Sequence, residues 1–143
     1  MVDIHVERTI AAAPERVFDW LADPKSLKTA PQVLGAHWVK RSSGPSQGAL
    51  RDVIAVGWFR ERITAYERPH RFSYLILRSV PPFRHEGGTL TLTPSGDGTH
   101  VDWLSRYTHP AYAGGKLLEA ISRRLLLSGF TAILAGCAKA LER

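Results

Sequence analysis

The chain has 143 residues, of which 44% are hydrophobic and 22% are charged, and its formal net charge is +6. This length is typical of one domain, and the composition is close to the globular average, which argues against intrinsic disorder. We therefore expect residues 1–143 to form a single domain with one hydrophobic core.

The first part of the chain changes from strand periodicity to helix periodicity. Residues 3–11 are predicted to form a strand, because apolar and polar side chains roughly alternate there. A helix begins near Pro14, since proline is tolerated in a first helical turn, where the amides have no partner within the helix. The Asp23-Pro24 pair ends this helix and opens a second, short one.

Six further strands are predicted, separated by residues that favour turns. Within them the side chains alternate with a period of two, although both faces of some runs are partly apolar. The segment Ser95-Gly96-Asp97-Gly98 predicts a hairpin, because glycine adopts the positive φ that such turns require. The predicted strands are residues 36–41, 48–56, 59–67, 71–80, 85–94 and 99–108.

The last part of the chain is predicted to be one long helix over residues 115–141. This stretch has no proline, and Ile121 and Leu125 lie on one apolar side at helical spacing. Gly129 and Gly136 each lower helix stability by about 1 kcal/mol relative to alanine. We expect these small residues to let the helix lie close against a sheet.

No targeting or membrane segment is expected. The longest uncharged apolar stretch, residues 125–138, is shorter than the ~20 residues that a bilayer requires. The N-terminus alternates at once and lacks the pattern of a signal peptide, so a cytoplasmic location is predicted. The lone Cys137 lies in an apolar stretch and is interpreted as a small buried hydrophobic residue.

The order of the elements predicts the α+β class. Consecutive strands with short links form an antiparallel meander, and the helices stand at fixed places instead of alternating with strands. The expected fold is a curved seven-stranded antiparallel sheet that wraps around the long C-terminal helix. Two short helices follow the first strand. An apolar ligand cavity is expected between the sheet and the long helix.

This arrangement resembles the helix-grip superfamily of START-like (SRPBCC) proteins, and within it the polyketide cyclase/dehydrase branch. The resemblance covers essentially the whole chain and is carried by residues 10–18, 21–24, 66–74 and 96–103. It implies binding of apolar or amphipathic small molecules between sheet and helix, where some members catalyse cyclisation, dehydration or hydrolysis. The shared motifs are structural, so no catalytic residue is carried over.

Two residues are weak catalytic candidates. Glu61 shares a strand face with Phe59, and a carboxyl group in an apolar cavity suits general acid–base chemistry. The alternative is a glutamate at the rim, paired with a nearby arginine. His85 begins a strand near the expected cavity mouth and could move a proton, the favoured alternative being an inert histidine at the rim. Its neighbour Glu86 should point to the opposite face of the strand.

The expected ligand-binding residues are aromatic, apolar or polar side chains on the inward faces of the strands and the long helix. Arg78 is included because it is in step with Tyr74 and could anchor an acidic group, the alternative being a solvated strand end. The apolar loop Pro81-Pro82-Phe83 is a candidate lid. The full set is Phe59, Glu61, Tyr74, Arg78, Trp103, Tyr107, Ile121 and Leu125.

Other site classes find no support in the sequence. There is no metal-ligand spacing, no glycine-rich phosphate loop and no nucleophile elbow, so neither a metal nor a cofactor is expected. Arginines concentrate between Gly57 and Glu86, but no nucleic-acid motif accompanies them. They are Arg60, Arg62, Arg68, Arg71, Arg78 and Arg84.

Three functions remain. The leading hypothesis is binding of a hydrophobic or amphipathic small molecule by a monomer or homodimer. The second is a polyketide cyclase or dehydratase type of enzyme that uses acid–base groups in the same cavity. The third is a protein-interaction module that uses the basic face.

Overall fold

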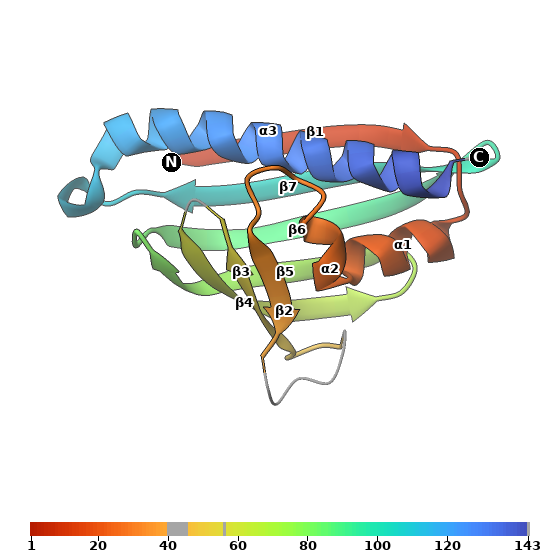
Figure 1. Ribbon diagram of the computed structural model, residues 1–143, viewed down its shortest axis with the longest axis horizontal. Coiled ribbons are helices and arrows are strands. Elements are labelled where there is room, and N and C mark those ends of the chain that lie inside the picture. Colours follow the sequence, from red (N-terminus) through yellow and green to blue (C-terminus); the bar gives the residue numbers. More distant parts are fainter. Residues whose placement is uncertain (40–45, 56, 143) are drawn as a thin grey trace.

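A computed structural model describes residues 1–39, 46–55 and 57–142. Within them it confirms the predicted α+β fold, with a seven-stranded antiparallel sheet, two short helices after the first strand and a long C-terminal helix (Figure 1). The strands are β1 (Val2–Ile10), β2 (Gly35–Trp38), β3 (Leu50–Ile54), β4 (Trp58–Glu67), β5 (Arg71–Val80), β6 (Arg84–Ser95) and β7 (Gly98–Thr108). The helices are α1 (Pro14–Ala22), α2 (Pro24–Leu27), the 3-10 turn η1 (Ala111–Ala113) and α3 (Gly115–Leu141).

The sheet is a meander with one added edge strand. Its order is β1-β7-β6-β5-β4-β3-β2, and every neighbouring pair is antiparallel. Figure 1 shows α3 running along β1 and β7, with α1 and α2 near its C-terminal half. The predicted strand ends at Arg41 and Val56 lie outside the described residues, and β2 and β3 are otherwise shorter than expected.

The two halves of α3 have different surroundings. Ile133, Leu134, Cys137 and Ala138 are buried in the C-terminal half, where they belong to the main hydrophobic core. No side chain of residues 115–132 is buried, although many of them are apolar. The C-terminal half of the helix is therefore buried in the core, whereas over residues 115–132 only partly buried side chains such as Leu127 and Phe130 pack against it. Cys137 is a buried free cysteine, as predicted, and burial raises the pKa of its thiol to about 12.

By length and composition alone, α3 is apolar enough to cross a membrane, which differs from the expectation drawn from residues 125–138. The expectation used the longest uncharged stretch, whereas a membrane span tolerates a few charged residues. In this structure the C-terminal half of the helix packs into the core between sheet and short helices, as a core helix does.

Of the three register shifts in the described part of the sheet, two lie beside residues predicted to belong to the site. Arg60 pairs with Arg78, but Glu61 pairs with Ile76, so Leu77 is an extra residue on β5. A bulge of this kind reverses the alternation of inward and outward side chains beyond it. Arg78 was expected to share the face of Tyr74, and instead it is exposed.

The second shift lies at the start of β6. His85 pairs with Tyr107 and Gly87 pairs with Arg106, which leaves Glu86 as the extra residue. Beyond this bulge Gly88 and Leu90 continue the inward face on which His85 lies. His85 is consequently held inside the sheet, while Glu86 is exposed.

The two glycines of α3 have different roles. A Cβ atom at Gly136 would lie 2.7 Å from Thr29 Oγ1, whereas a Cβ atom at Gly129 would meet only Gln32 Oε1, at 3.9 Å. We expected both glycines to let α3 lie close against the sheet. Only Gly136 makes a close approach, and it does so to Thr29, in the segment after α2.

Alanine at the two glycines should change stability in opposite directions. Gly129→Ala is expected to raise the free energy of unfolding by about 1 kcal/mol, because alanine favours the helix and the space is open. Gly136→Ala is expected to lower it, since the overlap with Thr29 costs about 1–3 kcal/mol. Urea denaturation of both variants measures the difference. Stabilisation by both substitutions would contradict this account of Gly136.

Candidate ligand cavity

A cavity of about 250 Å³ lies between the sheet and the N-terminal half of α3. Side chains from β3, β4, β5, β6 and β7 form its floor, and α3 forms its roof. Almost all of the lining is apolar. Of the residues predicted to bind a ligand, those that line it are Phe59, Glu61, Tyr74, Trp103, Tyr107, Ile121 and Leu125. His85 lines it as well, and Arg78 does not.

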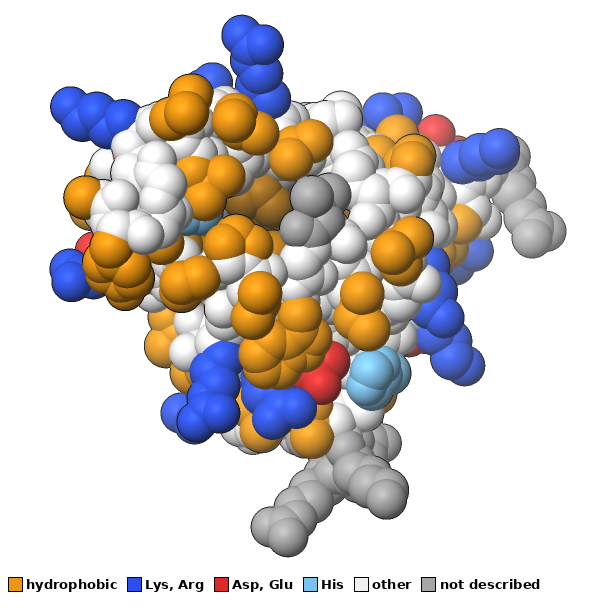
Figure 2. Space-filling view, turned by 60° about the vertical axis from the view of Figure 1, so that its left-hand side comes forward, with side chains coloured by type: hydrophobic (Ala, Val, Ile, Leu, Met, Phe, Trp, Pro, Cys, Tyr) orange, Lys and Arg blue, Asp and Glu red, His pale blue; other side chains and the backbone are white. Residues whose placement is uncertain are grey.

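An open apolar groove leads to this cavity. It shares Pro81, Leu118 and Ile121 with the cavity lining. At its outer edge Tyr112 is 85% exposed and Leu117 is 75% exposed. Figure 2 shows hydrophobic side chains gathered around a hollow on this face of the molecule. The arrangement gives an apolar molecule a route between solvent and the cavity.

The candidate lid borders both spaces. Pro81 lines the cavity and the groove, while Phe83 lines the cavity and stacks on His109 at 5.5 Å between ring centres. Phe83 also contacts Tyr107 and Phe59 edge-on. The loop is thus part of the cavity wall, and its movement as a lid stays a prediction.

One ion pair is buried inside the cavity. Arg51 of β3 and Glu61 of β4 are cross-strand partners, and Arg51 Nε donates to Glu61 Oε1 at 2.6 Å. Arg51 is only 3% exposed, and its guanidinium lies 5.7 Å from the centre of the Tyr74 ring. The sequence left two interpretations of Glu61 open, a carboxyl group in the cavity or a rim glutamate paired with an arginine. The structure combines parts of both, because Glu61 lines the cavity and is paired with Arg51.

Sequence reasoning missed Arg51. Its residue type favoured an outward position, and nothing in the composition of its strand marks it as buried. The register of the β3–β4 hairpin could have revealed it. Ile54 pairs with Trp58 at the turn, and three residues further along each strand Arg51 lies opposite Glu61. An arginine directly opposite a glutamate that shares a face with apolar residues indicates a buried pair.

Tyr74 stands at the centre of the cavity floor. Its hydroxyl oxygen accepts a hydrogen bond from Trp103 Nε1 at 3.0 Å, and burial raises the pKa of this hydroxyl far above its usual value. Gly88 makes room for the ring, since a Cβ atom there would overlap the Tyr74 ring carbons. The Tyr74 hydroxyl is a neutral hydrogen-bonding group at any ordinary pH.

His85 has both ring nitrogens engaged. The Ile76 N–H donates to Nδ1 at 3.0 Å, so the neutral ring carries its proton on Nε2, which lies 3.0 Å from Ser105 Oγ. The ring stacks on Tyr74 at 5.4 Å between centres. Burial lowers the pKa of His85 to about 4. His85 is therefore uncharged at neutral pH, and its one basic lone pair is already occupied.

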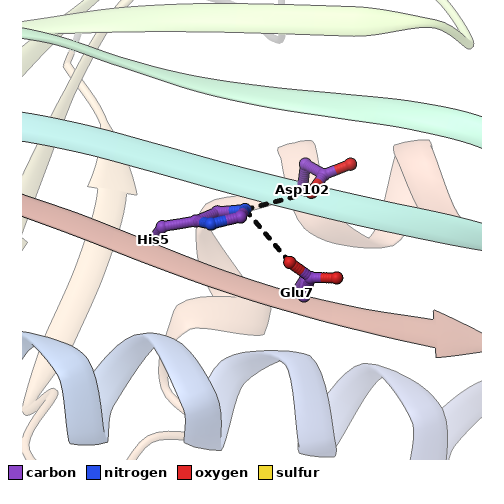
Figure 3. A group of neighbouring side chains, drawn as sticks. All are labelled: His5, Glu7 and Asp102. Carbon is purple, nitrogen blue, oxygen red and sulfur yellow. Dashed lines mark hydrogen bonds and ion pairs between the residues drawn. The ribbon is translucent and has the colours of Figure 1, made fainter.

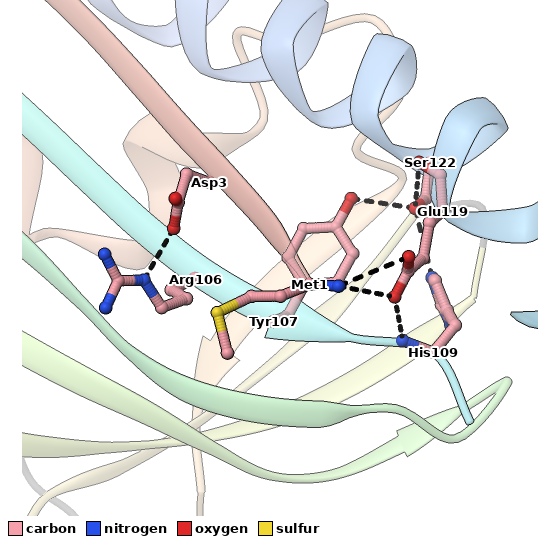
Figure 4. Close-up of polar contacts among 7 residues, drawn as sticks. All are labelled: Met1, Asp3, Arg106, Tyr107, His109, Glu119 and Ser122. Atoms are coloured by element: carbon pink, nitrogen blue, oxygen red, sulfur yellow. Dashed lines mark hydrogen bonds and ion pairs between the residues drawn. The ribbon is translucent and has the colours of Figure 1, made fainter. Parts of the chain in front are cut away.

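A chain of polar contacts joins β7 to the first turns of α3 (Figure 4). Ser122 Oγ lies 2.8 Å from the Tyr107 hydroxyl and 3.0 Å from His109 Nε2. Glu119 accepts the His109 amide at 2.9 Å, and this hydrogen bond lowers the pKa of the carboxyl. The Met1 amino group lies 3.5 Å from the same carboxylate. These contacts attach the start of α3 to the end of β7, and Tyr107, His109 and Ser122 themselves line the cavity.

Outside the cavity, one group of side chains could supply metal ligands. His5, Glu7 and Asp102 lie on β1 and β7, with ligand atoms within 4.8 Å of one another (Figure 3). Sequence spacing did not reveal them, because β1 and β7 are distant in the chain. His5 Nε2 lies 3.0 Å from Asp102 Oδ1 and 3.4 Å from Glu7 Oε2. The side chains are largely exposed, and the contact between His5 and Asp102 has the geometry of a hydrogen bond on the surface of the sheet.

The arginines of the basic region are partly neutralised. Arg60 pairs with Asp52 through two hydrogen bonds, and Arg68 pairs with Asp19 in the same way. Arg71 forms an ion pair with Glu67. Three of the six arginines therefore have carboxylate partners, which weakens the case for a basic docking face.

Residues 1–142 match the family model described as "Polyketide cyclase / dehydrase and lipid transport". A comparison with curated proteins gave no match. Among solved structures, TTHA0849 from Thermus thermophilus is 24% identical, with 96% of this chain and 95% of that chain covered and a TM-score of 0.77. CV1439 from Chromobacterium violaceum is 20% identical, with coverages of 99% and 97% and a TM-score of 0.73.

A third solved structure, described as the Aha1 dimer from Colwellia psychrerythraea, is 15% identical over 99% of this chain and 97% of that one, with a TM-score of 0.71. Similarity at these identities shows the fold alone. The family match extends over nearly the full length and agrees with the sheet and helix arrangement described above. The chain therefore belongs to the polyketide cyclase / dehydrase and lipid transport family.

Proposed function

We propose that the protein binds a small hydrophobic or amphipathic molecule in the cavity between its sheet and α3. One observation carries this proposal: Leu118, Ile121 and Leu125 of α3 border a cavity and do not belong to the core, although Leu127 and Phe130 of the same stretch pack against it. Apolar surface that a fold leaves unpacked destabilises the protein until something covers it. An apolar ligand would provide that cover.

The size of the cavity favours compact ligands. A cavity of 150 Å³ lined by aliphatic and aromatic side chains holds benzene in another protein, so one of about 250 Å³ accepts about ten non-hydrogen atoms. A longer molecule would extend through the groove beside Tyr112 and Leu117. We therefore expect one or two fused rings, or a short chain, to fit best.

Catalysis is not included in the proposal. Glu61 already accepts a hydrogen bond from Arg51, and the Nδ1 lone pair of His85 accepts one from the Ile76 amide. A general base needs a free lone pair within reach of the substrate. The enzyme hypothesis therefore requires a rearrangement at His85, whereas at Glu61 it requires a substrate to reach the second carboxylate oxygen, Oε2.

We extend the proposal to domain organisation, cellular location and oligomeric state. A single domain, a cytoplasmic location and a monomer or homodimer are all consistent with a small ligand-binding protein of this family. The relative from Colwellia psychrerythraea is described as a dimer, which makes the homodimer the state to test first, by light scattering.

Filling the cavity should abolish binding without harming the fold. Gly129 borders the cavity, and a Cβ atom added there would have no neighbour closer than 3.9 Å. Gly129→Leu should place a side chain in the ligand's space, while Gly129→Ala should leave most of that space free. We expect compact apolar compounds to raise the melting temperature of the wild type and of Gly129→Ala, but not of Gly129→Leu.

The measurement is a thermal-shift screen of fatty acids, sterols and aromatic polyketides, preceded by native mass spectrometry of the purified protein. A copurifying molecule would name the ligand class directly. No stabilisation of the wild type by any class, or equal stabilisation of Gly129→Leu, would contradict binding at this cavity.

A further inference from the structure

The buried guanidinium of Arg51 has an unused hydrogen-bond donor. Its Nε is paired with Glu61, but its Nη1 is enclosed and has no partner among the described residues. Leaving a buried donor without a partner costs free energy, and the cost is larger for a charged group. Because Arg51 lines the cavity, an oxygen atom of a bound ligand could fill this role.

Two further enclosed atoms of the cavity lining lack a partner among the described residues, Gln32 Oε1 and His109 Nδ1, whereas the polar groups of Tyr74 and His85 are paired. Gln32 Oε1 can only accept a hydrogen bond, so it offers no donor to a ligand oxygen. Tyr74 accepts from Trp103, and His85 is bonded to both Ile76 and Ser105. A ligand that bonds to them must compete with existing contacts, whereas Arg51 offers a donor at no such cost. The strongest polar contact available to a ligand at this end is therefore to Arg51.

The charges in the cavity favour a carbonyl oxygen over a carboxylate as the ligand group that binds Arg51. Among the described lining residues, Arg51 and Glu61 are the groups charged at neutral pH, and they neutralise each other at 2.6 Å. A carboxylate beside Arg51 would bring a second negative charge close to Glu61, in surroundings that solvate it poorly. A carbonyl oxygen accepts the same hydrogen bond without adding charge.

We propose that Arg51 anchors the ligand by donating from Nη1 to a carbonyl oxygen of a compact, uncharged molecule whose remaining surface is apolar. Glu61 holds the guanidinium in place, and the Tyr74 ring supports its face. This inference rests on the proposed function and adds the chemical class of the ligand: cyclic or aromatic ketones, quinones and lactones instead of hydrocarbons or acids.

Three probes of similar size test the inference by isothermal titration calorimetry. Tetralin is a bicyclic hydrocarbon, 1-tetralone adds one carbonyl group, and 1-naphthoate carries a carboxylate. We expect wild-type protein to bind 1-tetralone at least about tenfold more tightly than tetralin, as a hydrogen bond to a charged group contributes. 1-Naphthoate should bind more weakly than 1-tetralone.

The double variant Arg51→Met/Glu61→Leu provides the control. It removes both charges together, so that neither is left buried alone, and such replacements are commonly tolerated. It should lose the preference for 1-tetralone over tetralin, measured as the ratio of the two affinities within the variant. Circular dichroism verifies that the variant is folded.

The outcomes separate the two proposals. If neither tetralin nor 1-tetralone binds to the wild type, the proposed function itself is contradicted, and this inference fails with it. If both bind equally, or if 1-naphthoate binds most tightly, the cavity is a ligand site but Arg51 does not select a carbonyl group. Retention of the ketone preference by the double variant would equally overturn the inference.

Discussion

Glu61→Leu should be among the most destabilising single substitutions in this protein. It leaves the guanidinium of Arg51 buried, charged and without its partner at 2.6 Å. Removing one member of a buried ion pair costs about 3–5 kcal/mol, because the remaining charge is neither solvated nor neutralised. Urea denaturation should show this loss in the free energy of unfolding with an unchanged slope.

Two controls identify the cause. Adding Arg51→Met to Glu61→Leu should restore most of the stability, since no unpaired charge remains. Arg68 and Asp19 form an ion pair at the surface, where their side chains are 45% and 54% exposed. Arg68→Met should therefore cost much less than Glu61→Leu, because both groups stay solvated. Equal losses for Glu61→Leu and Arg68→Met would contradict the account.

Stability should fall as the pH drops from about 6.5 toward 4, because His85 is buried in its neutral form. Its pKa is about 4 in the folded protein and about 6.5 when unfolded. Between these values the unfolded chain binds the proton and the folded protein does not, so protonation favours unfolding. The accumulated loss below pH 4 is on the order of 3 kcal/mol, since each pKa unit corresponds to about 1.4 kcal/mol.

His85→Asn separates this effect from other titrations. The asparagine oxygen can accept the hydrogen bond from the Ile76 amide, as Nδ1 does, but it does not titrate. The free energy of unfolding of His85→Asn should change much less between pH 6.5 and 4.5 than that of the wild type. Burial also lowers the pKa of His109, and the hydrogen bond from the His109 amide lowers the pKa of Glu119, so both groups contribute to a remaining slope. Asp19 and Asp52, with pKa values lowered by Arg68 and Arg60, contribute only at still lower pH. An unchanged slope in His85→Asn would contradict the assignment.

The fold could be predicted from the sequence because its strongest signals are local. Alternation along the strands, the turn at Ser95-Gly96-Asp97-Gly98 and the apolar run of α3 each depend on neighbours in the chain. Once these elements were in order, an antiparallel meander closed by one long helix followed. The family match over residues 1–142 agrees with this reasoning.

The site was less predictable because bulges reverse the alternation. Regular alternation along the strand predicts that Arg78 lies on the same face as Tyr74. The extra residue Leu77 breaks this alternation, and Arg78 points outward. The extra residue Glu86 likewise put His85 on the inward face. A bulge depends on how two strands pair, and the sequence of one strand does not reveal it.

Arg51 shows a second reason why the site was harder to predict from the sequence than the fold. Its burial is explained only by Glu61 opposite it, so the two residues must be considered together. The same holds for Gly88, whose lack of a side chain is explained by the Tyr74 ring on the next strand. Both pairs depend on register, which is harder to predict from sequence than the type of each element.

The location of a bound ligand tests the central claim most directly. Intermolecular NOEs should be measured between tetralin and isotope-labelled protein at saturating ligand. Our account predicts NOEs to Trp103, Tyr107 and Phe130, which line the interior of the cavity between sheet and α3. NOEs confined to the exposed side chains of Tyr112 and Leu117, or none at all, would show that the cavity is not the binding site.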